Sequence, residues 1–291
     1  MTIRETFQTP GVHLSCEVFP PKAFDKLDDA RAVVRAICQL RPAYVSVTYG
    51  AAGNTQRFTQ EISAYVQSLG VTALSHLTCV NATRDAVNGV LDALQAQGVH
   101  NVLALRGDLP EGAAFPTDAH FRHANELIAA IHAHGGFCVG AACYPEGHPE
   151  AFDRDRDLDS LRFKQDAGAD FLTTQMFFDN TVLYQFLFRA LKKGVTLPVS
   201  AGVMPVVNAR QIRRILSLSS ASLPQRFLAI LDRFGRDPAS MEKAGIAYAT
   251  DQIIDLVANG VNHIHLYTMN RPDVARAIFQ NLGPILEGSH E

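Results

Sequence analysis

The sequence lacks the motifs that identify several common enzyme classes. No Gly-x-Gly-x-x-Gly follows a strand-like run, which argues against a Rossmann dinucleotide-binding module. The motifs of serine hydrolases (Gly-x-Ser-x-Gly) and zinc proteases (His-Glu-x-x-His) are also missing. None of the six lysines lies in a strand-like run, which argues against a Schiff-base aldolase.

Long apolar runs and export signals are missing too. No apolar stretch approaches about 18 residues, and no positively charged, apolar leader opens the chain, so we expect neither a membrane span nor export. The net charge is −3 and the basic residues are scattered, which favours neither nucleic acid nor an anionic membrane surface. These features predict a cytoplasmic protein.

Cysteines are few, and their number is odd. The five cysteines have no metal-type spacing, which predicts reduced, mostly buried thiols rather than disulfides or a metal site. Four lie in strand-like runs and one in a helix-like run: Cys16, Cys79, Cys138 and Cys143, and Cys38.

What the sequence contains is a regular alternation of strand-like and helix-like runs. Its 291 residues, 47% hydrophobic and 19% charged, can build a large core, and this length is normal for a single closed α/β barrel. The predicted strands are His13–Phe19, Tyr44–Tyr49, Ala73–Val80, Val102–Arg106, Phe137–Tyr144, Phe171–Phe177, Val199–Val203 and His263–Thr268. The predicted helices are Asp25–Leu40, Thr83–Gln97, Asp118–His134, Asp157–Ala167, Val182–Lys192, Ala209–Leu216 and Pro272–Leu282.

Eight such units predict an α/β fold of the (β/α)8 TIM-barrel class. Residues 217–259 predict a helical insertion of about two extra helices before the last strand. No linker composition interrupts the chain, so residues 1–291 are expected to form one domain.

Polar and charged residues end almost every predicted strand. In such barrels the carboxyl ends of the strands carry the catalytic groups. The run Asn101–Pro110 ends in a cation and an anion, Arg106 and Asp108, with Gly107 between them to allow a sharp turn. The other strand ends offer Glu17, Thr48, Tyr49, His76, Tyr144, Gln175, Met204, Pro205, Asn270 and Arg271. This predicts a large ligand contacted from all sides.

Glu17 is the first candidate for acid–base chemistry. Strand alternation puts His13, Ser15, Glu17 and Phe19 on one face. A carboxyl group among apolar neighbours should favour its neutral form, which suits a general acid. An ion pair, for example with Arg106, is an equally open interpretation.

Other motifs carry weaker signals. His76 interrupts an apolar strand, and such a histidine is more often a core residue than a functional one. His263 and His265 face the same side of the last strand, and two packed or hydrogen-bonded rings are the better interpretation than a metal site. Gly50–Gly53 is a weak phosphate-loop candidate or a plain turn. The sign-alternating run Asp153–Asp157 predicts a solvated helix start.

Taken together, these segments resemble the methylenetetrahydrofolate reductase family. The matching segments, in the family's order and nearly over the whole length, are Glu17–Pro21, Val45–Ala51, His76–Cys79, Ala104–Pro110, Ala142–Glu150, Asp166–Ala169, Thr174–Asp179 and Tyr267–Arg271. The chain resembles the short bacterial form, which lacks the regulatory domain of eukaryotic members. The resemblance implies a non-covalent FAD across the strand ends. NADH or NADPH and 5,10-methylenetetrahydrofolate would use the same flavin face in turn.

The resemblance also implies roles for individual residues. Glu17 resembles the general acid that opens the folate ring to an iminium, and Asp108 resembles an aspartate near the flavin and the pterin. The positions that resemble the FAD shell are Thr48, Tyr49, Ala51, His76, Arg106, Gly107, Asp108, Tyr144, His148, Asp157, Ser160 and Lys164. The positions that resemble substrate contacts are Glu17, Thr48, Asp108, Gln175, Gln211 and Arg271.

Two positions depart from the family's pattern. Ile215 stands where some members carry an aromatic residue that packs on the substrate, so stacking is lost there. Cys143 replaces a smaller or aliphatic residue and has no assigned role.

The resemblance further implies a homo-oligomer, a dimer or tetramer, and a product that feeds methionine synthesis. The bacterial short form makes NADH the default donor, although no selector between NADH and NADPH can be read from the sequence. Two alternatives remain open: a metal-dependent hydrolase using His76, His263, His265 and a rim aspartate, and a flavin binder without activity.

Overall fold

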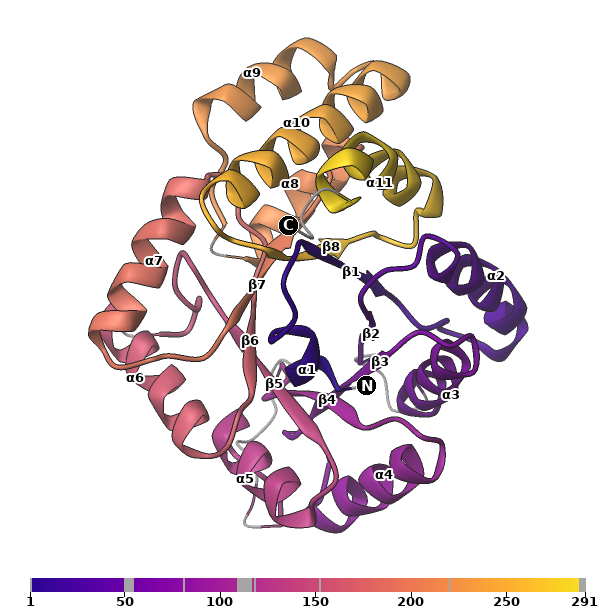
Figure 1. The fold of residues 1–291 in the computed structure, drawn as a ribbon, viewed down its shortest axis with the longest axis vertical. Helices are drawn as coiled ribbons and strands as arrows, with labels where there is room; N and C mark the ends of the chain where they lie inside the picture. The colour runs from indigo at the N-terminus through magenta and orange to yellow at the C-terminus, as the bar shows by residue number, and fades with distance from the viewer. Residues whose placement is uncertain are drawn as a thin grey trace.

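Eight parallel strands close into a barrel in their order along the chain, β1 to β8 (Figure 1). The structure is a computed structural model, and it describes residues 2–49, 55–80, 82–108, 117, 119–151, 153–219 and 221–287. The strands are β1 (His13–Val18), β2 (Val45–Val47), β3 (Ala73–Thr78), β4 (Asn101–Leu105), β5 (Cys138–Cys143), β6 (Phe171–Thr174), β7 (Val199–Val203) and β8 (His263–Tyr267). The predicted α/β TIM-barrel fold is confirmed.

Helices surround the ring of strands, and the short helix α1 lies within it (Figure 1). They are α1 (Ile3–Thr6), the short 3-10 helix η1 (Phe24–Lys26), α2 (Leu27–Cys38), α3 (Thr55–Ser68), α4 (Arg84–Ala96), α5 (Ala124–His134), α6 (Arg154–Asp166), α7 (Asn180–Lys192), α8 (Ala209–Leu218), α9 (Gln225–Phe234), α10 (Pro238–Ala258) and α11 (Pro272–Glu287). Most of these helices return the chain from the carboxyl end of one strand to the amino end of the next, as parallel pairing requires.

The predicted element boundaries differ from the observed ones by a few residues. Strand β7 was predicted correctly, whereas β6 ends at Thr174, three residues before the predicted end, because the chain leaves the ladder at the rim. Helix α5 begins at Ala124 rather than Asp118, which lies outside the described residues. Helix α6 begins earlier than predicted, at Arg154, because the Asp153 side chain caps it by accepting from the Arg156 amide. Helices α1 and α3 were not among the predicted ranges.

Among the described residues, buried apolar side chains form three separate clusters. One layer lies between the outer face of the strands and the helices, and includes the fully buried Val18, Val47 and Leu77. All five cysteines are free and buried, as predicted, although Cys79 lies one residue past β3. Burial in this layer raises the pKa of Cys143, so this thiol is uncharged.

Helix α1 closes the amino end of the barrel. Its Ile3 is fully buried and packs with Tyr44, Leu74, Leu103 and Phe171, which lie at that end of the strands. The Ile3 amide donates to Asn101 Oδ1 at 2.9 Å, and Figure 1 places α1 within the ring of strands. The open mouth of the barrel is therefore at the carboxyl ends of the strands.

The predicted insertion before the last strand contains α9 and α10. With α8, these helices form an apolar cluster over the end of β7 that includes Phe178, Met204, Phe227 and Met241. Gly245 of α10 packs directly on the backbone after β7, because a Cβ there would lie 2.0 Å from the Val206 carbonyl oxygen. The insertion is thus fixed to the barrel at the mouth. That residues 1–291 form one domain stays a prediction.

Among the described residues, no helix has both the length and the apolar composition needed to cross a membrane.

Candidate active site

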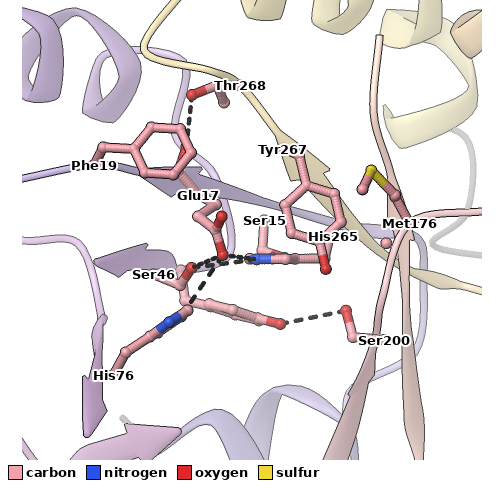
Figure 2. Close-up of polar contacts among 12 residues, drawn as sticks. Ser15, Glu17, Phe19, Ser46, His76, Met176, Ser200, His265, Tyr267 and Thr268 are labelled. Atoms are coloured by element: carbon pink, nitrogen blue, oxygen red, sulfur yellow. Dashed lines mark hydrogen bonds and ion pairs between the residues drawn. The ribbon is translucent and has the colours of Figure 1, made fainter. Parts of the chain in front are cut away.

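Glu17 lies at the carboxyl end of β1 and points into the barrel (Figure 2). It is 8% exposed. Its Oε2 lies 3.4 Å from Ser46 Oγ in β2, 3.6 Å from His76 Nε2 in β3 and 3.7 Å from His265 Nε2 in β8. The Thr268 hydroxyl, just after β8, donates to the Glu17 carbonyl at 2.5 Å. The carboxyl group therefore lies among side chains from three other strands, β2, β3 and β8.

His76 is a neutral neighbour of Glu17. Burial lowers the pKa of His76 to about 4, although the nearby Glu17 carboxyl opposes the shift. Its Nε2 is buried and has no hydrogen-bond partner among the described residues, since the 3.6 Å to Glu17 exceeds a hydrogen bond. This nitrogen is thus available to a group that enters the site.

The two histidines of β8 are packed or hydrogen-bonded, as predicted. His265 is 1% exposed, with Nδ1 2.7 Å from Ser15 Oγ and Nε2 3.2 Å from Ser46 Oγ. His263 stacks on His13 with the ring centroids 4.9 Å apart. Across the described ranges, no group of three or more His, Cys, Asp or Glu is arranged to hold a metal ion.

Arg106 follows β4 and pairs with Glu150 rather than with Glu17. Its Nη1 and Nη2 lie 2.5 Å and 2.7 Å from the two Glu150 carboxylate oxygens, and this pairing raises the pKa of Arg106. The alternative that Glu17 forms an ion pair with Arg106 is therefore wrong. The physical reason is that Glu150, in the loop after β5, binds the Arg106 guanidinium in a bidentate ion pair through both carboxylate oxygens.

The turn after Arg106 requires glycine. Gly107 has a φ of +84°, and a Cβ there would lie 2.9 Å from the Thr78 Cβ. The turn presents the exposed Asp108 at the mouth, where its charge helps raise the pKa of Tyr144 to about 12, after burial as the main cause. Glu17 and Asp108 therefore lie at the same end of the barrel, as their placement at the ends of parallel strands requires.

The loop after β5 and helix α6 carry a second cluster of polar side chains. His148 donates its amide to Asp157 Oδ2 at 3.1 Å, and its ring packs edge-on against Tyr144. Ser160 Oγ donates to the Asp157 carbonyl at 2.6 Å. Lys164 Nζ donates to the Ala142 carbonyl at 2.8 Å, and burial lowers the pKa of this lysine. Burial also raises the pKa of Asp157 and lowers that of His148. These polar side chains are therefore partly removed from water.

The remaining predicted residues are spread around the mouth. Thr48 and Tyr49 follow β2, and Gln175 follows β6 with its Oε1 accepting from the Met176 amide. Gln211 lies in the first turn of α8, where its amide is capped by Asn208. Ala51, and with it the Gly50–Gly53 candidate, lies outside the described residues.

Arg271 follows β8 and already has two acidic partners. Its Nη2 lies 2.7 Å from Glu242 Oε2 and 2.5 Å from Asp273 Oδ2, and both carboxylates raise the pKa of Arg271. The two residues before it, Met269 and Asn270, adopt left-handed φ values of +52° and +56°, which non-glycine residues rarely take. This strained turn fixes where Arg271 leaves the barrel.

Sequence reasoning did not assign roles to Ser46, Thr268 or Glu150, which contact Glu17 or Arg106, or to Ser15, which contacts His265. Ser15 could have been found, because strand alternation places it on the same face as Glu17. Ser46 could not, since only the register between β1 and β2 places it opposite Glu17.

Chemically, the mouth combines a buried carboxyl group, neutral imidazoles, a cation held in place and polar groups on most sides. A carboxyl group held by hydroxyl and imidazole neighbours can donate a proton to a ligand in the barrel. Cations and a glycine turn can contact phosphate groups of a large ligand.

The comparisons with known proteins point to one family. The model of the methylenetetrahydrofolate reductase family matches residues 2–283 of the chain. The 5,10-methylenetetrahydrofolate reductases of Pectobacterium carotovorum and Escherichia coli are each 32% identical to this chain over 273 residues. The matched region is 94% of this chain, and 90% and 91% of the two relatives, respectively. Methylenetetrahydrofolate reductase (NADH) 1 of Arabidopsis thaliana is 31% identical over 94% of this chain, which spans 48% of the plant protein.

Solved structures show the same fold at low identity. An uncharacterised protein from Clostridium thermocellum, which binds two copies of 5-methyl-5,6,7,8-tetrahydrofolic acid, has a TM-score of 0.61 at 10% identity, covering 98% of this chain and 99% of its own. A 2,3-dimethylmalate lyase has a TM-score of 0.55 at 12% identity, covering 99% and 86%.

Proposed function

The chain belongs to the methylenetetrahydrofolate reductase family, and on that basis we propose that it reduces 5,10-methylenetetrahydrofolate to 5-methyltetrahydrofolate. NADH or NADPH is the electron donor and FAD the bound cofactor of this proposal, with the two substrates using the site in turn. NADH is the default donor, and methionine synthesis would consume the product. Members of the family are oxidoreductases, so the chain is an enzyme of that class.

The observation that carries the proposal is the placement of Glu17. Opening the imidazolidine ring of the folate requires a proton on a ring nitrogen, and a buried carboxyl group at the mouth of a barrel can supply it. The carboxyl oxygen of Glu17 faces Ser46, His76 and His265. The Arg106 guanidinium does not pair with it, because that guanidinium is bound to Glu150. Glu17 is therefore the proposed general acid.

The residues at the mouth fit a flavin dinucleotide. The buried Nε2 of His76 lacks a hydrogen-bond partner among the described residues, and a side chain at Gly107 would meet Thr78. Arg106 and Lys164 supply positive charge for a pyrophosphate. The proposed FAD contacts are His76, Arg106, Gly107 and Lys164, together with Thr48, Tyr49, Ala51, Asp108, Tyr144, His148, Asp157 and Ser160. When bound, FAD supplies a centre that takes a hydride from the nicotinamide and gives one to the folate.

The remaining polar groups bind and orient the folate in this proposal. Asp108 is exposed at the end of β4, where a carboxylate stabilises positive charge that develops on the opened ring. Gln175 and Gln211 offer amide donors and acceptors, Thr48 a hydroxyl, and Arg271 a guanidinium. Arg271 shares its charge with Glu242 and Asp273, so it contacts a ligand as an oriented donor rather than as a free cation.

The test is the absorption spectrum of the purified protein. We expect a yellow protein with one FAD per chain, whose flavin absorbance is bleached by NADH without oxygen and restored by 5,10-methylenetetrahydrofolate with formation of 5-methyltetrahydrofolate. A colourless protein that neither binds FAD nor shows NADH–menadione activity contradicts the proposal. Stoichiometric metal in that protein would favour the hydrolase alternative. A yellow protein that NADH cannot bleach would be a flavin binder without this activity. Light scattering measures the oligomeric state, which we propose to be a dimer or tetramer.

A further inference from the structure

The backbone pairing between β1 and β8 ends at Glu17, the proposed acid. The partner of Glu17 in the last pair of this ladder is Tyr267. Beyond this pair, side chains that follow β8 bond to the backbone that leaves β1. The Thr268 hydroxyl donates to the Glu17 carbonyl at 2.5 Å (Figure 2). The Asn270 side chain bonds to the backbone of Phe19. Side chains therefore continue the junction of the two strands past the end of the ladder.

Asn270 pairs with Phe19 much as a neighbouring strand would. The Phe19 amide donates to Asn270 Oδ1 at 2.8 Å, and Asn270 Nδ2 donates to the Phe19 carbonyl at 3.0 Å. A carboxamide can make both bonds because it carries an acceptor and a donor side by side, like a peptide group. Two bonds to one residue fix the orientation of its backbone as well as its position.

The turn that carries Asn270 holds the carboxamide in place. Asn270 has a φ of +56° and Met269 a φ of +52°. Asparagine adopts this left-handed conformation more readily than most residues other than glycine. The backbone amide of Asn270 donates to Thr268 Oγ1 at 3.2 Å, so the hydroxyl that bonds to Glu17 also bonds to the turn. Thr268 is 1% exposed, which shields both of its bonds from water.

The backbone just after Glu17 is held from both neighbouring strands. On the β8 side, Asn270 fixes Phe19, two residues after Glu17. On the β2 side, the Thr48 amide donates to the Val18 carbonyl at 3.1 Å. The point from which the Glu17 side chain starts is thus set by bonds to the backbone on either side of β1.

The contacts of the Glu17 carboxyl group are too long to fix it by themselves. Ser46 Oγ donates to Glu17 Oε2 at 3.4 Å, whereas a typical O–H···O bond measures about 2.7 Å. His76 Nε2 and His265 Nε2 lie 3.6 Å and 3.7 Å from the same oxygen, beyond hydrogen-bond distance. The position of the carboxyl group in the mouth therefore depends on where the backbone of Glu17 is held.

Closing the barrel does not require the bonds from Asn270. Strands β1 and β8 already pair five residues in register, more than any other two neighbouring strands. The bonds from Asn270 add only to the end of this ladder that carries Glu17 and faces the mouth. Their contribution is therefore to the geometry of the mouth rather than to the closure of the ring.

We propose that Asn270 is a positioning residue that holds the exit of β1, and with it the Glu17 carboxyl group, in the place where the ligand receives its proton. Without the carboxamide, the exit of β1 moves on the β8 side and the carboxyl group moves with it. A displacement of about 1 Å can cost about 100-fold in rate. The effect on folate reduction rests on the proposed function, whereas the hold on the exit of β1 does not.

The test is Asn270→Gly, which removes the carboxamide but allows the left-handed turn, because glycine adopts a positive φ freely. We expect the single-turnover rate of folate reduction to fall about 10-fold to 100-fold. The folate concentration that gives half of the maximal rate should change by less than about threefold, and flavin reduction by NADH should stay within about twofold. A merely structural role would not separate the two half-reactions. An equal loss in both, or no loss in either, overturns the proposal.

Met269→Gly is the matched control. It gives the same turn added freedom at the neighbouring left-handed position, and it keeps the carboxamide of Asn270. The Met269 side chain packs on the apolar cluster at the end of β7. Folate reduction should stay within about threefold of the wild type. A loss as large as in Asn270→Gly assigns the effect to the freedom of the turn and overturns the proposal.

Amide hydrogen exchange tests the hold on the exit of β1 without any activity. The Phe19 amide donates to Asn270, so its exchange should become about 10-fold faster or more in Asn270→Gly. The Cys16 amide, which donates to the Tyr44 carbonyl at 3.1 Å, should exchange at the wild-type rate. Unchanged exchange at Phe19 overturns the proposal even if folate reduction falls.

Asn270→Asp is a second variant, and it replaces Asn270→Gly if that variant does not fold. It keeps an acceptor for the Phe19 amide but places an oxygen, which cannot donate, toward the Phe19 carbonyl. Folate reduction should fall while flavin reduction stays unchanged, and wild-type rates in both half-reactions overturn the proposal. A wild type that fails to reduce folate refutes the proposed function. The exchange rate at Phe19 then decides alone whether Asn270 holds the exit of β1.

Discussion

At the scale of single residues, Glu17 separates the two halves of the proposed reaction. We expect Glu17→Gln to lower the rate of folate reduction by about 100-fold to 10,000-fold, because an amide cannot donate the acidic proton. Flavin reduction by NADH needs no proton from Glu17 and should stay within about twofold of the wild type. Stopped-flow measurements of the two half-reactions check this.

The matched control for that substitution is Glu61→Gln. Glu61 lies in α3 and pairs with Arg31 at 2.8 Å, away from the mouth. Both half-reactions should be unchanged in this variant. An equal loss of both half-reactions in Glu17→Gln would remove Glu17 as the general acid and indicate a general disturbance of the site.

Glu17 could be found from the sequence because its type and its place at a strand end are local features. Ser46 and Glu150 could not, because their importance depends on partners that are distant in sequence. Ser46 lies 29 positions from Glu17 and Glu150 lies 44 positions from Arg106. No local pattern indicates that either pair meets.

At the scale of elements, α1 stabilises the end of the barrel opposite to the site. Ile3 is fully buried among Leu74, Leu103 and Phe171. We expect Ile3→Ala to lower the free energy of unfolding by about 2–5 kcal/mol, because the cavity cannot collapse against the strand ends. Urea unfolding measures this change.

The matched control is Ile254→Ala in α10. Ile254 is 42% exposed, so the loss there should be below about 1 kcal/mol. Flavin reduction and folate reduction should be unchanged in both variants. A loss of activity in folded Ile3→Ala would show that the amino end of the barrel influences the mouth.

The strands and most helices were predictable because their apolar residues recur with the period of the element. Helix α1 was not, since its four residues are too few to show a helical period. Its place in the structure depends on the buried end of the barrel, which only the closed ring of strands creates.

At the scale of the whole molecule, one buried and one half-buried histidine make stability depend on pH. Burial lowers the pKa of both His76 and His263 from 6.5 to about 4. Between pH 7 and pH 5 these side chains take up protons in the unfolded chain but not in the folded one, so the folded state loses stability as the pH falls. For His76 alone the loss is about 2 kcal/mol. Urea unfolding at the two pH values measures it.

Replacing one of these histidines should reduce the pH dependence. We expect His263→Asn to show a smaller loss of stability between pH 7 and pH 5 than the wild type. His132→Asn, which changes an exposed residue of α5, should match the wild type. Stability that is equal at both pH values in the wild type would contradict the uncharged state of these two histidine rings.

The barrel seam lies between the first and last strands, and it carries part of the site. Ser15 and His265 are 250 positions apart, and Asn270 exchanges two hydrogen bonds with the Phe19 backbone across the same seam. A nascent chain on the ribosome therefore lacks His265, a neighbour of the proposed acid Glu17, until β8 has been synthesised. Fragments that stop before β8 should lack folate reduction however well their early strands form. Co-translational quality control would encounter an open barrel with two exposed strand edges.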